Sequence, residues 1–331
     1  MRIASANSSP PSRKRNSSLT TPHKAADLHV ELPNLTTDRS YDPAYETSVE
    51  ISPLIRRVLA RNPNAFTFHG TGTYIVGRGK VAVIDPGPLI DEHVEALKAA
   101  LKNDVVTHIL ITHTHNDHSP AAAPLKAATG AKTYAFGPHG AGKKSEGVDV
   151  EEGGDMDFRP DVTMRDGDAI EGEGWTFDCV YTPGHTSNHM CFALHEERAL
   201  FSGDHVMGWS TTVIAPPDGD MAQYLASLRK LTTRDDQIYY PTHGNAVKNP
   251  QRFVSKLIEH RHARERQIAV CLKDGLTRIP DMVAVIYSEI DKRLHPAAAM
   301  SVLAHLRHMV ATGRAVTDGP ATAASVYRPA T

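Results

Sequence analysis

Cysteine, aromatic residues and long hydrophobic runs are all scarce in this chain of 331 residues. Its three cysteines, Cys179, Cys191 and Cys271, are too few and too scattered for a disulfide framework, and they fit a reducing compartment. No run of 18 apolar residues occurs, so we expect no membrane-spanning helix. The near-neutral charge of −2 and a hydrophobic share of 40% indicate a globular protein with one large domain, or a large and a small one.

Residues 1–40 are expected to form a disordered tail. They are rich in Ser, Pro, Asn and Thr and show no periodic apolar pattern that could build a core. The basic stretch up to Ala26 has the composition of a transit peptide, but a plain tail is the preferred interpretation. Since no apolar stretch typical of a secretory signal is present, we expect a cytoplasmic protein with no membrane partner.

Short β-rich runs and helical periodicity alternate along the middle of the chain. Strands are predicted at Thr73–Val76, Val81–Asp85, Thr107–Thr112, Trp175–Tyr181, His189–Leu194, Ala199–Ser202 and Ile238–Tyr240, and helices at Asp91–Leu101 and Asp218–Leu231. Residues 146–173, rich in acids and glycine, are predicted to be mostly surface loop. From Asn249 onward the pattern becomes helical almost to the end.

Histidine is the abundant residue, with 19 copies, and its placement indicates chemistry. Three of them, with an aspartate, lie within six residues directly after an apolar strand: His113, His115, Asp117 and His118. Neutral imidazoles and a carboxylate are the ligands that zinc and similar divalent ions take. Burying this set without a metal would leave several polar groups unsatisfied. The sequence therefore predicts a metal site at the end of this strand.

Three further turns repeat the same geometry. His185, Asp204 and His243 each lie on a glycine-containing turn after an apolar strand. Each residue alone would be weak evidence for a metal site, but chance rarely repeats the same arrangement three times. His189 lies close to His185 in the sequence, and His205 directly follows Asp204. For both, the sequence leaves open a role in the pocket or that of an ordinary buried histidine. Trp209 and the loop 210–220 are a candidate substrate wall or an ordinary surface loop.

The pattern HxHxDH, then His, Asp and His, resembles the metallo-β-lactamase superfamily over residues 50–250. The resemblance implies an α/β (α+β) four-layer αββα sandwich with a two-metal site at one edge of its sheets. It implies that His113, His115 and His185 hold the first ion, that Asp117, His118 and His243 hold the second, and that Asp204 bridges both. Asp85 would accept a hydrogen bond from a ligand imidazole. Zinc suits the histidines, and manganese or iron(II) would suit the mixed site.

The last third predicts three helices and a closing hairpin, the layout of a winged helix. The motif His260-Arg261-x-x-Arg264-Glu265 lies on the first helix. The arrangement is similar to the β-lactamase-like-protein-2 group, whose members append such a domain. We therefore predict a catalytic domain over residues 41–255 and a winged-helix domain over 256–331. This last segment is basic, which is a weak hint of a nucleic-acid partner, but its helix at Ala297–Leu306 has no Arg or Lys before Arg307.

Three functions remain open from the sequence. The first is a two-metal hydrolase in which a metal-bridging hydroxide attacks a small-molecule ester, thioester or related carbonyl, with Asp117 and Asp204 in catalytic roles. The second is an endoribonuclease acting on single-stranded RNA through the basic C-terminal domain. The third is a winged-helix binding protein with a vestigial metal site, against which the complete ligand set argues. A winged helix used for packing or for a homodimer is slightly favoured over one that reads nucleic acid.

Overall fold

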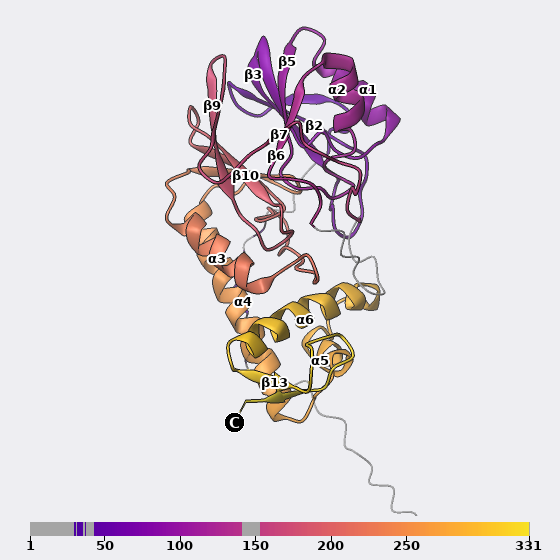
Figure 1. Cartoon of the computed structure of the whole chain (residues 1–331), viewed down its shortest axis with the longest axis vertical. Helices are drawn as coiled ribbons and strands as arrows, with labels where there is room; N and C mark the ends of the chain where they lie inside the picture. The colour runs from indigo at the N-terminus through magenta and orange to yellow at the C-terminus, as the bar shows by residue number, and fades with distance from the viewer. Residues whose placement is uncertain (1–29, 31, 36, 38–42, 141–152, 331) are drawn as a thin grey trace, which may run out of the picture.

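The computed structural model describes residues 30, 32–35, 37, 43–140 and 153–330 (Figure 1). Most of the predicted tail, residues 1–40, therefore lies outside the described residues, and its disorder stays a prediction. The few tail residues that are described contact the C-terminal helices. The carbonyl of Val30 accepts a hydrogen bond from Gln267, and that of Asn34 accepts one from Lys256.

The first sheet has seven strands that are neighbours in chain order. They are β1 (Ser48–Glu50), β2 (Ile55–Leu59), β3 (Gly72–Arg78), β4 (Lys80–Ile84), β5 (Val105–Leu110), β6 (Lys132–Ala135) and β7 (Val162–Thr163). The first four pair antiparallel, and β4 to β7 pair parallel. Parallel neighbours need a crossover, and α1 (Asp91–Ala100) and α2 (Ala122–Thr129) supply the first two.

The second sheet has five strands in the order β12-β11-β10-β9-β8. They are β8 (Ala169–Gly172), β9 (Trp175–Tyr181), β10 (Met190–Leu194), β11 (Ala199–Gly203) and β12 (Ile238–Pro241). The parallel pair β11 and β12 is connected through α3 (Met221–Thr232). Asp220 caps this helix by accepting a hydrogen bond from the backbone of Gln223, so the helix begins where the sequence offers an N-cap.

Alternation along the strands builds two faces on each sheet. In β10, Met190, Phe192 and Leu194 face the first sheet, whereas Cys191 and Ala193 face α3. Burying each large apolar side chain contributes about 1.5–3 kcal/mol. With α1 and α2 on the outer face of the first sheet and α3 and α4 on that of the second, the layers run α, β, β, α (Figure 1). The predicted four-layer sandwich is confirmed.

Three helices and a small hairpin follow, as predicted. They are α4 (Pro250–Lys273), α5 (Ile279–Ile286), the short 3-10 helix η2 (Lys292–Leu294), α6 (His295–Ala311), β13 (Ala315–Thr317) and β14 (Tyr327–Pro329). Helix α4 runs without a break across the predicted domain boundary at 255/256. Its first half packs on the second sheet through Val254 and Leu257, and its second half packs on α5 and α6 through Ile268 and Leu272. The domain division stays a prediction, since one helix serves both parts.

Some elements differ from the sequence expectation. The strands β1, β2 and β6 were not expected, and the stretch 146–173, predicted to be mostly loop, contains β7 and β8. These strands are short, and β8 is held by pairing with β9 rather than by its own composition. Residues 141–152 lie outside the described part of the chain. Among the described helices, none combines the length and apolarity needed to cross a membrane.

The three cysteines are buried and unpaired, as the sequence indicated. Cys179 lies between the two sheets, Cys191 lies between the second sheet and α3, and Cys271 lies among α4, α5 and α6. Burial raises the pKa of Cys179 and Cys191 to about 12 and that of Cys271 to about 11. All three thiols are therefore protonated and unreactive in the folded protein.

A buried carboxylate ties α4 to α6 and to the residue just before the C-terminal hairpin. Glu265 on α4 accepts hydrogen bonds from His308 at 2.6 Å and from Arg314 at 2.5 Å, and His305 lies 3.5 Å away. Burial raises the pKa of Glu265, but the nearby His305 and the hydrogen bonds from Arg314 and His308 outweigh it and hold the pKa well below its usual 4.5. A carboxylate with a depressed pKa stabilises the fold above its unfolded-state pKa and loses that contribution as the pH falls.

We therefore predict that Glu265→Gln lowers the thermal midpoint at neutral pH and that the gap to wild type narrows below about pH 4.5. Thermal unfolding of both proteins in matched buffers measures this gap. The exposed Asp235→Asn variant is the control and should track wild type throughout. A gap that stays constant through the acid range would contradict the ionised Glu265.

Candidate metal centre

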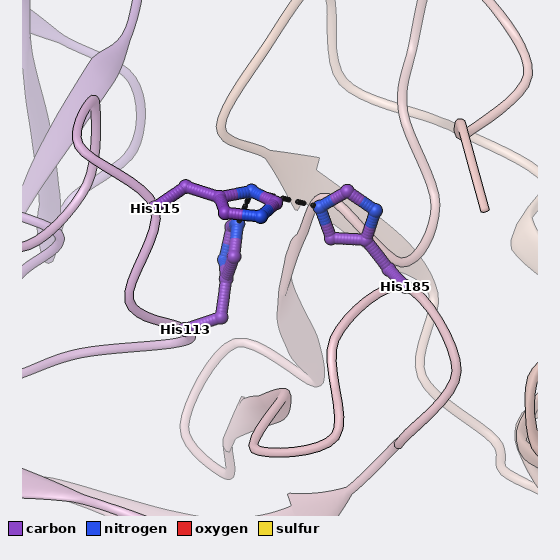
Figure 2. A group of neighbouring side chains, drawn as sticks. All are labelled: His113, His115 and His185. Carbon is purple, nitrogen blue, oxygen red and sulfur yellow. Dashed lines mark hydrogen bonds between the residues drawn. The ribbon is translucent and has the colours of Figure 1, made fainter. Parts of the chain in front are cut away.

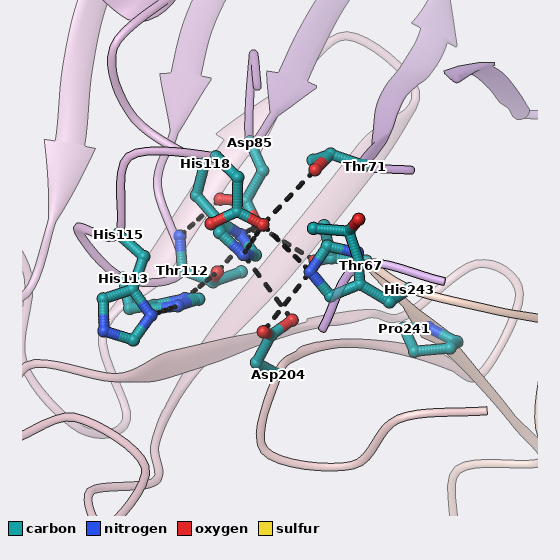
Figure 3. A network of polar contacts seen from close by, with 12 residues as sticks. Thr67, Thr71, Asp85, Thr112, His113, His115, His118, Asp204, Pro241 and His243 are labelled. Atoms are coloured by element: carbon teal, nitrogen blue, oxygen red, sulfur yellow. Dashed lines mark hydrogen bonds and ion pairs between the residues drawn. The ribbon is translucent and has the colours of Figure 1, made fainter. Parts of the chain in front are cut away.

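The seven predicted ligand side chains converge at one edge of the sandwich (Figures 2 and 3). Each follows a strand: the HxHxDH run follows β5, the turn with His185 follows β9, Asp204 follows β11, and His243 follows β12. Because β11 and β12 are parallel, their carboxyl ends meet at the same edge. The turns can therefore aim side chains from distant parts of the sequence into one volume.

The first group consists of three histidines (Figure 2). Nδ1 of His115 lies 3.0 Å from Nε2 of His113 and 3.2 Å from Nε2 of His185. Burial, and next the neighbouring imidazoles, lower the pKa of His113 and His115 well below 6.5. Neutral imidazoles whose nitrogens face one another are suited to hold a divalent ion between them.

The second group consists of Asp117, His118 and His243. Figure 3 labels the two histidines of this group. Oδ2 of Asp117 lies 3.1 Å from Nε2 of His243 and 3.4 Å from Nε2 of His118. Burial raises the pKa of Asp117, but the two imidazoles outweigh it and lower the pKa overall. Asp117 is therefore ionised.

Asp204 lies between the two groups. Its Oδ1 is 3.6 Å from Nε2 of His118, and its Oδ2 is 3.4 Å from Nε2 of His243 and 3.9 Å from Nε2 of His185. His243 and His118 hold its pKa well below the usual range against the opposing effect of burial. A single carboxylate thus faces both sets of donors.

The donor set fits divalent ions on two counts. Histidine nitrogens and carboxylate oxygens are the ligand types of zinc, manganese and iron. In addition, Nε2 of His118 and Oδ1 of Asp204 are buried without a hydrogen-bond partner among the described residues. Buried polar atoms are normally satisfied, and an ion between the two groups would satisfy both of these.

Hydrogen bonds behind the ligands fix their rings. His118 donates from Nδ1 to Asp85 Oδ2 at 3.0 Å, His185 to the carbonyl of Val213 at 2.8 Å, and His243 to the carbonyl of Gly70 at 3.0 Å. In each ring Nδ1 is engaged, so Nε2 faces the centre. Asp85 thus lies behind the imidazole of the candidate ligand His118, and its role there stays a prediction.

Asp85 is also the centre of a wider network. It accepts hydrogen bonds from the backbone N–H and the hydroxyl of Thr112, both at 2.7 Å, and from the hydroxyl of Thr242 at 3.2 Å. Thr112 and Thr242 each stand directly before a candidate ligand, His113 and His243. One carboxylate at the end of β4 therefore connects two of the strand ends that carry the site, those of β5 and β12. Figure 3 shows Asp85 beside Thr112 and His118.

The sequence did not point to several residues that support the site. Thr71 donates to Asp117 Oδ2 at 3.3 Å, and Asn188 donates to Thr114 Oγ1 at 2.9 Å and to the carbonyl of Gly137. His139 contacts the same Thr114 hydroxyl at 2.9 Å. In the sequence, each of these residues is only a polar residue near the end of a strand, and such residues are common in proteins without a metal site.

The undecided histidines lie behind the ligands. Nε2 of His189 accepts the backbone N–H of Asp204 at 3.2 Å, and its other nitrogen lies 2.9 Å from the hydroxyl of Thr182. His205 packs on Tyr224 with ring centroids 4.7 Å apart. Burial lowers the pKa of His189 well below 6.5 and that of His205 to about 3, so both rings are neutral. They support the turn that carries Asp204.

An open pocket leads to the centre. Its floor includes His115, Asp117, His185, Asp204 and His243, and its walls include Phe66, Met207, Trp209 and Val213. Trp209 stacks on Phe68 with centroids 4.9 Å apart and planes 8° apart. The sequence left open whether the loop that begins with Trp209 is a wall of the site or an ordinary surface loop. The structure supports a wall beside the site.

Comparison with known proteins gives the family context. Residues 67–243 match the model of the metallo-β-lactamase superfamily, and residues 279–322 match that of the β-lactamase-associated winged helix domain. A β-lactamase-like protein 2 homolog from Caenorhabditis elegans is 33% identical over 277 residues, which cover 82% of this chain and 88% of that protein. An atrochrysone carboxyl ACP thioesterase from Aspergillus fumigatus is 34% identical over 230 residues, which cover 68% of this chain and 66% of that protein.

The fold comparison agrees. The crystal structure of a β-lactamase domain protein from Burkholderia ambifaria superimposes with a TM-score of 0.71 at 19% identity, covering 91% of this chain and all of that one. The match includes both the sandwich and the C-terminal helices. The predicted winged-helix layout is therefore confirmed.

Proposed function

Because this chain belongs to the metallo-β-lactamase superfamily and carries the donor set of a metal-dependent hydrolase, we propose that it holds two divalent ions and hydrolyses thioesters or related esters. The observation that carries this proposal is the position of Asp204. Its two oxygens lie within 3.9 Å of donors from both groups, as a carboxylate shared by two ions requires.

The grouping of the donor atoms supports the ligand sets that we propose. We assign His113, His115 and His185 to one ion, Asp117, His118 and His243 to the other, and Asp204 to both. We assign zinc to the site on its histidine content, with manganese or iron(II) as the alternatives that a mixed site accepts. When bound, two such ions supply an activated water and polarise the substrate oxygen.

The chain's own residues orient the reactants. Asp117 opens onto the pocket, and its Oδ2 is held by Thr71 and His243. An ionised carboxylate in this position orients the attacking water and accepts its hydrogen bond. The hydrogen bonds that the ligand rings donate to Asp85, Val213 and Gly70 keep these rings from turning, so the reacting geometry is set before substrate arrives.

The pocket favours an acyl substrate. Phe66, Met207 and Trp209 give it an apolar side next to the polar floor, which suits an acyl chain or ring placed beside a scissile carbonyl. Several relatives carry the name atrochrysone carboxyl ACP thioesterase, which supports a thioester as the bond that is cleaved. The unpaired state of all three cysteines supports a cytoplasmic location.

RNA cleavage is the less supported alternative. The helix α6, which a winged helix would use to read nucleic acid, has Val302, Ala304, His305 and Leu306 buried, and Ala304 packs in the same cluster as α3. A helix covered in this way acts as a packing element. The homodimer expected as another use of the winged helix stays a prediction.

The test uses the zinc-loaded full chain and two substrates in parallel. We expect it to release thiol from an acyl N-acetylcysteamine thioester, followed with a thiol reagent, and to leave labelled single-stranded RNA intact. Chelator-treated protein should be inactive and should recover when zinc is returned. Cleavage of RNA with no thioester hydrolysis would show that the substrate is RNA and not a thioester. Full activity after verified metal removal would overturn the metal mechanism.

A further inference from the structure

The motif His260-Arg261-x-x-Arg264-Glu265 on α4 has no part in the function proposed so far. Within it, Arg261 is only 4% exposed and reaches out of α4 towards the metal centre. Its Nη2 donates a hydrogen bond to the carbonyl of Thr212 at 2.5 Å, and its guanidinium carbon lies 5.0 Å from the centre of the Tyr224 ring. Thr212 belongs to the loop that follows Asp204.

The loop 209–213 contacts two of the assigned ligands. The hydroxyl of Thr212 donates to the carbonyl of Asp204 at 2.6 Å, and the carbonyl of Val213 accepts Nδ1–H of His185 at 2.8 Å. Arg261 therefore holds Thr212, which in turn holds the backbone carbonyl of Asp204. The next residue, Val213, orients the ring of His185. Both ligands face the same volume, with His185 Nε2 3.9 Å from Asp204 Oδ2.

Tyr224 reinforces the same connection. Its hydroxyl donates to the carbonyl of His205, directly after Asp204, at 3.0 Å. Its backbone passes so close to Gly184 that a Cβ there would lie 2.3 Å from it, which fixes the turn carrying His185. Arg261 thus packs on Tyr224, which itself contacts the residue after Asp204 and the turn that carries His185.

The partner of Arg261, rather than its burial alone, sets it apart from the other buried arginine of the motif: Arg261 donates to Thr212, whereas Arg264 donates to Gln267. In the described part of the chain it forms no ion pair with a carboxylate, and its Nε has no hydrogen-bond partner. Burying an unpaired charge is costly, and an apolar side chain of the same volume would pack at lower cost. What the guanidinium adds is a charge-assisted hydrogen bond to one chosen carbonyl, stronger than a neutral one.

We propose that Arg261 is a positioning residue that sets His185 and Asp204 for metal binding through the loop 209–213. The C-terminal helices would then contribute to the metal centre from outside it. This inference rests on the proposed two-metal site, because it concerns how that site is held.

The experiment compares Arg261→Met with Arg264→Met in the full chain. Arg264 is a matched control because it lies on the same helix, is 6% exposed and stacks on Tyr287 at 4.2 Å, yet donates to Gln267 rather than to the loop. The measurements are the rate of zinc release to a chromogenic chelator, the visible spectrum of the cobalt-substituted protein and the thermal midpoint.

We expect Arg261→Met to release zinc roughly ten-fold faster, at the lower end of what outer contacts of metal ligands contribute, and to alter the cobalt spectrum. Arg261→Lys, which can still reach the carbonyl, should recover part of both. Arg264→Met should lower the thermal midpoint comparably while zinc release and the cobalt spectrum stay as in wild type.

Wild-type zinc release and an unchanged cobalt spectrum in Arg261→Met would overturn the positioning role. If that variant does not fold, Arg261→Lys and Thr212→Val are compared instead, since the latter removes the hydroxyl that holds Asp204. Wild-type behaviour of both would overturn the inference equally. Failure of the wild-type protein itself to bind zinc would instead refute the proposed function, so the two failures are distinguishable.

Discussion

Replacing Asp204 with alanine is expected to remove both bound metals and the hydrolytic activity together. The carboxylate faces both donor groups, so its loss leaves two sets of ligands without the charge that holds the ions near each other. The ions contribute several kcal/mol to the stabilisation of the transition state, and each 1.36 kcal/mol is a factor of ten in rate. A loss of about 4 kcal/mol lowers kcat/KM by roughly 10³-fold.

Metal content and turnover are measured on the same preparation, by elemental analysis and by thioester hydrolysis. Asp178→Ala is the matched control, because Asp178 lies on β9 and pairs with His195 at the surface, with a side chain 41% exposed. It should keep two metals and wild-type activity. An Asp204→Ala protein with full metal content and full turnover would show that the bridging assignment is wrong.

The second large effect is expected from Asp85→Ala. This residue touches no substrate, but four hydrogen bonds end on its carboxylate, including the one that fixes the ring of His118. Removing it leaves the buried Nδ1 of His118 and the hydroxyl of Thr112 with no acceptor there. Loss of such an outer contact lowers metal affinity by about 10–100-fold, and we expect the upper end because this one carboxylate holds residues at the ends of both β5 and β12.

Zinc titration against a competing chelator measures the affinity, and thermal unfolding measures the stability. Asp85→Asn separates the two contributions. It preserves the shape and one acceptor oxygen, so the fold should survive better while His118 still loses its ionised partner. Equal zinc affinity in wild type, Asp85→Asn and Asp85→Ala would contradict the role assigned to Asp85.

The candidate ligands could be picked out from the sequence because each one stands on a short turn after an apolar strand. In His113, His185 and His243 the residue type and the preceding strand together carried the signal. The contacts behind them were much less visible. The acceptors for His185 and His243 are backbone carbonyls of Val213 and Gly70, and a carbonyl is present at every residue, so no side chain marks it.

The same reason explains why Arg261 was recognised as part of a motif but not as a neighbour of the site. Its partner is a carbonyl 49 residues away, on a loop whose path depends on the packing of α3. The predicted domain boundary stays a prediction, because it falls inside α4. Apolar periodicity shows where a helix lies, but it does not show which hydrophobic cores the helix packs in. Helix α4 packs in two of them, one with the second sheet and α3 and one with α5 and α6.

The placement of the three cysteines has a consequence for following how this protein unfolds. One thiol lies in each of three separate hydrophobic clusters, and none of the three reacts while its own cluster is closed. Timed alkylation, read peptide by peptide, would therefore date the opening of each layer independently. The order in which Cys271, Cys191 and Cys179 become labelled would tell whether the C-terminal helices open before the sandwich or together with it.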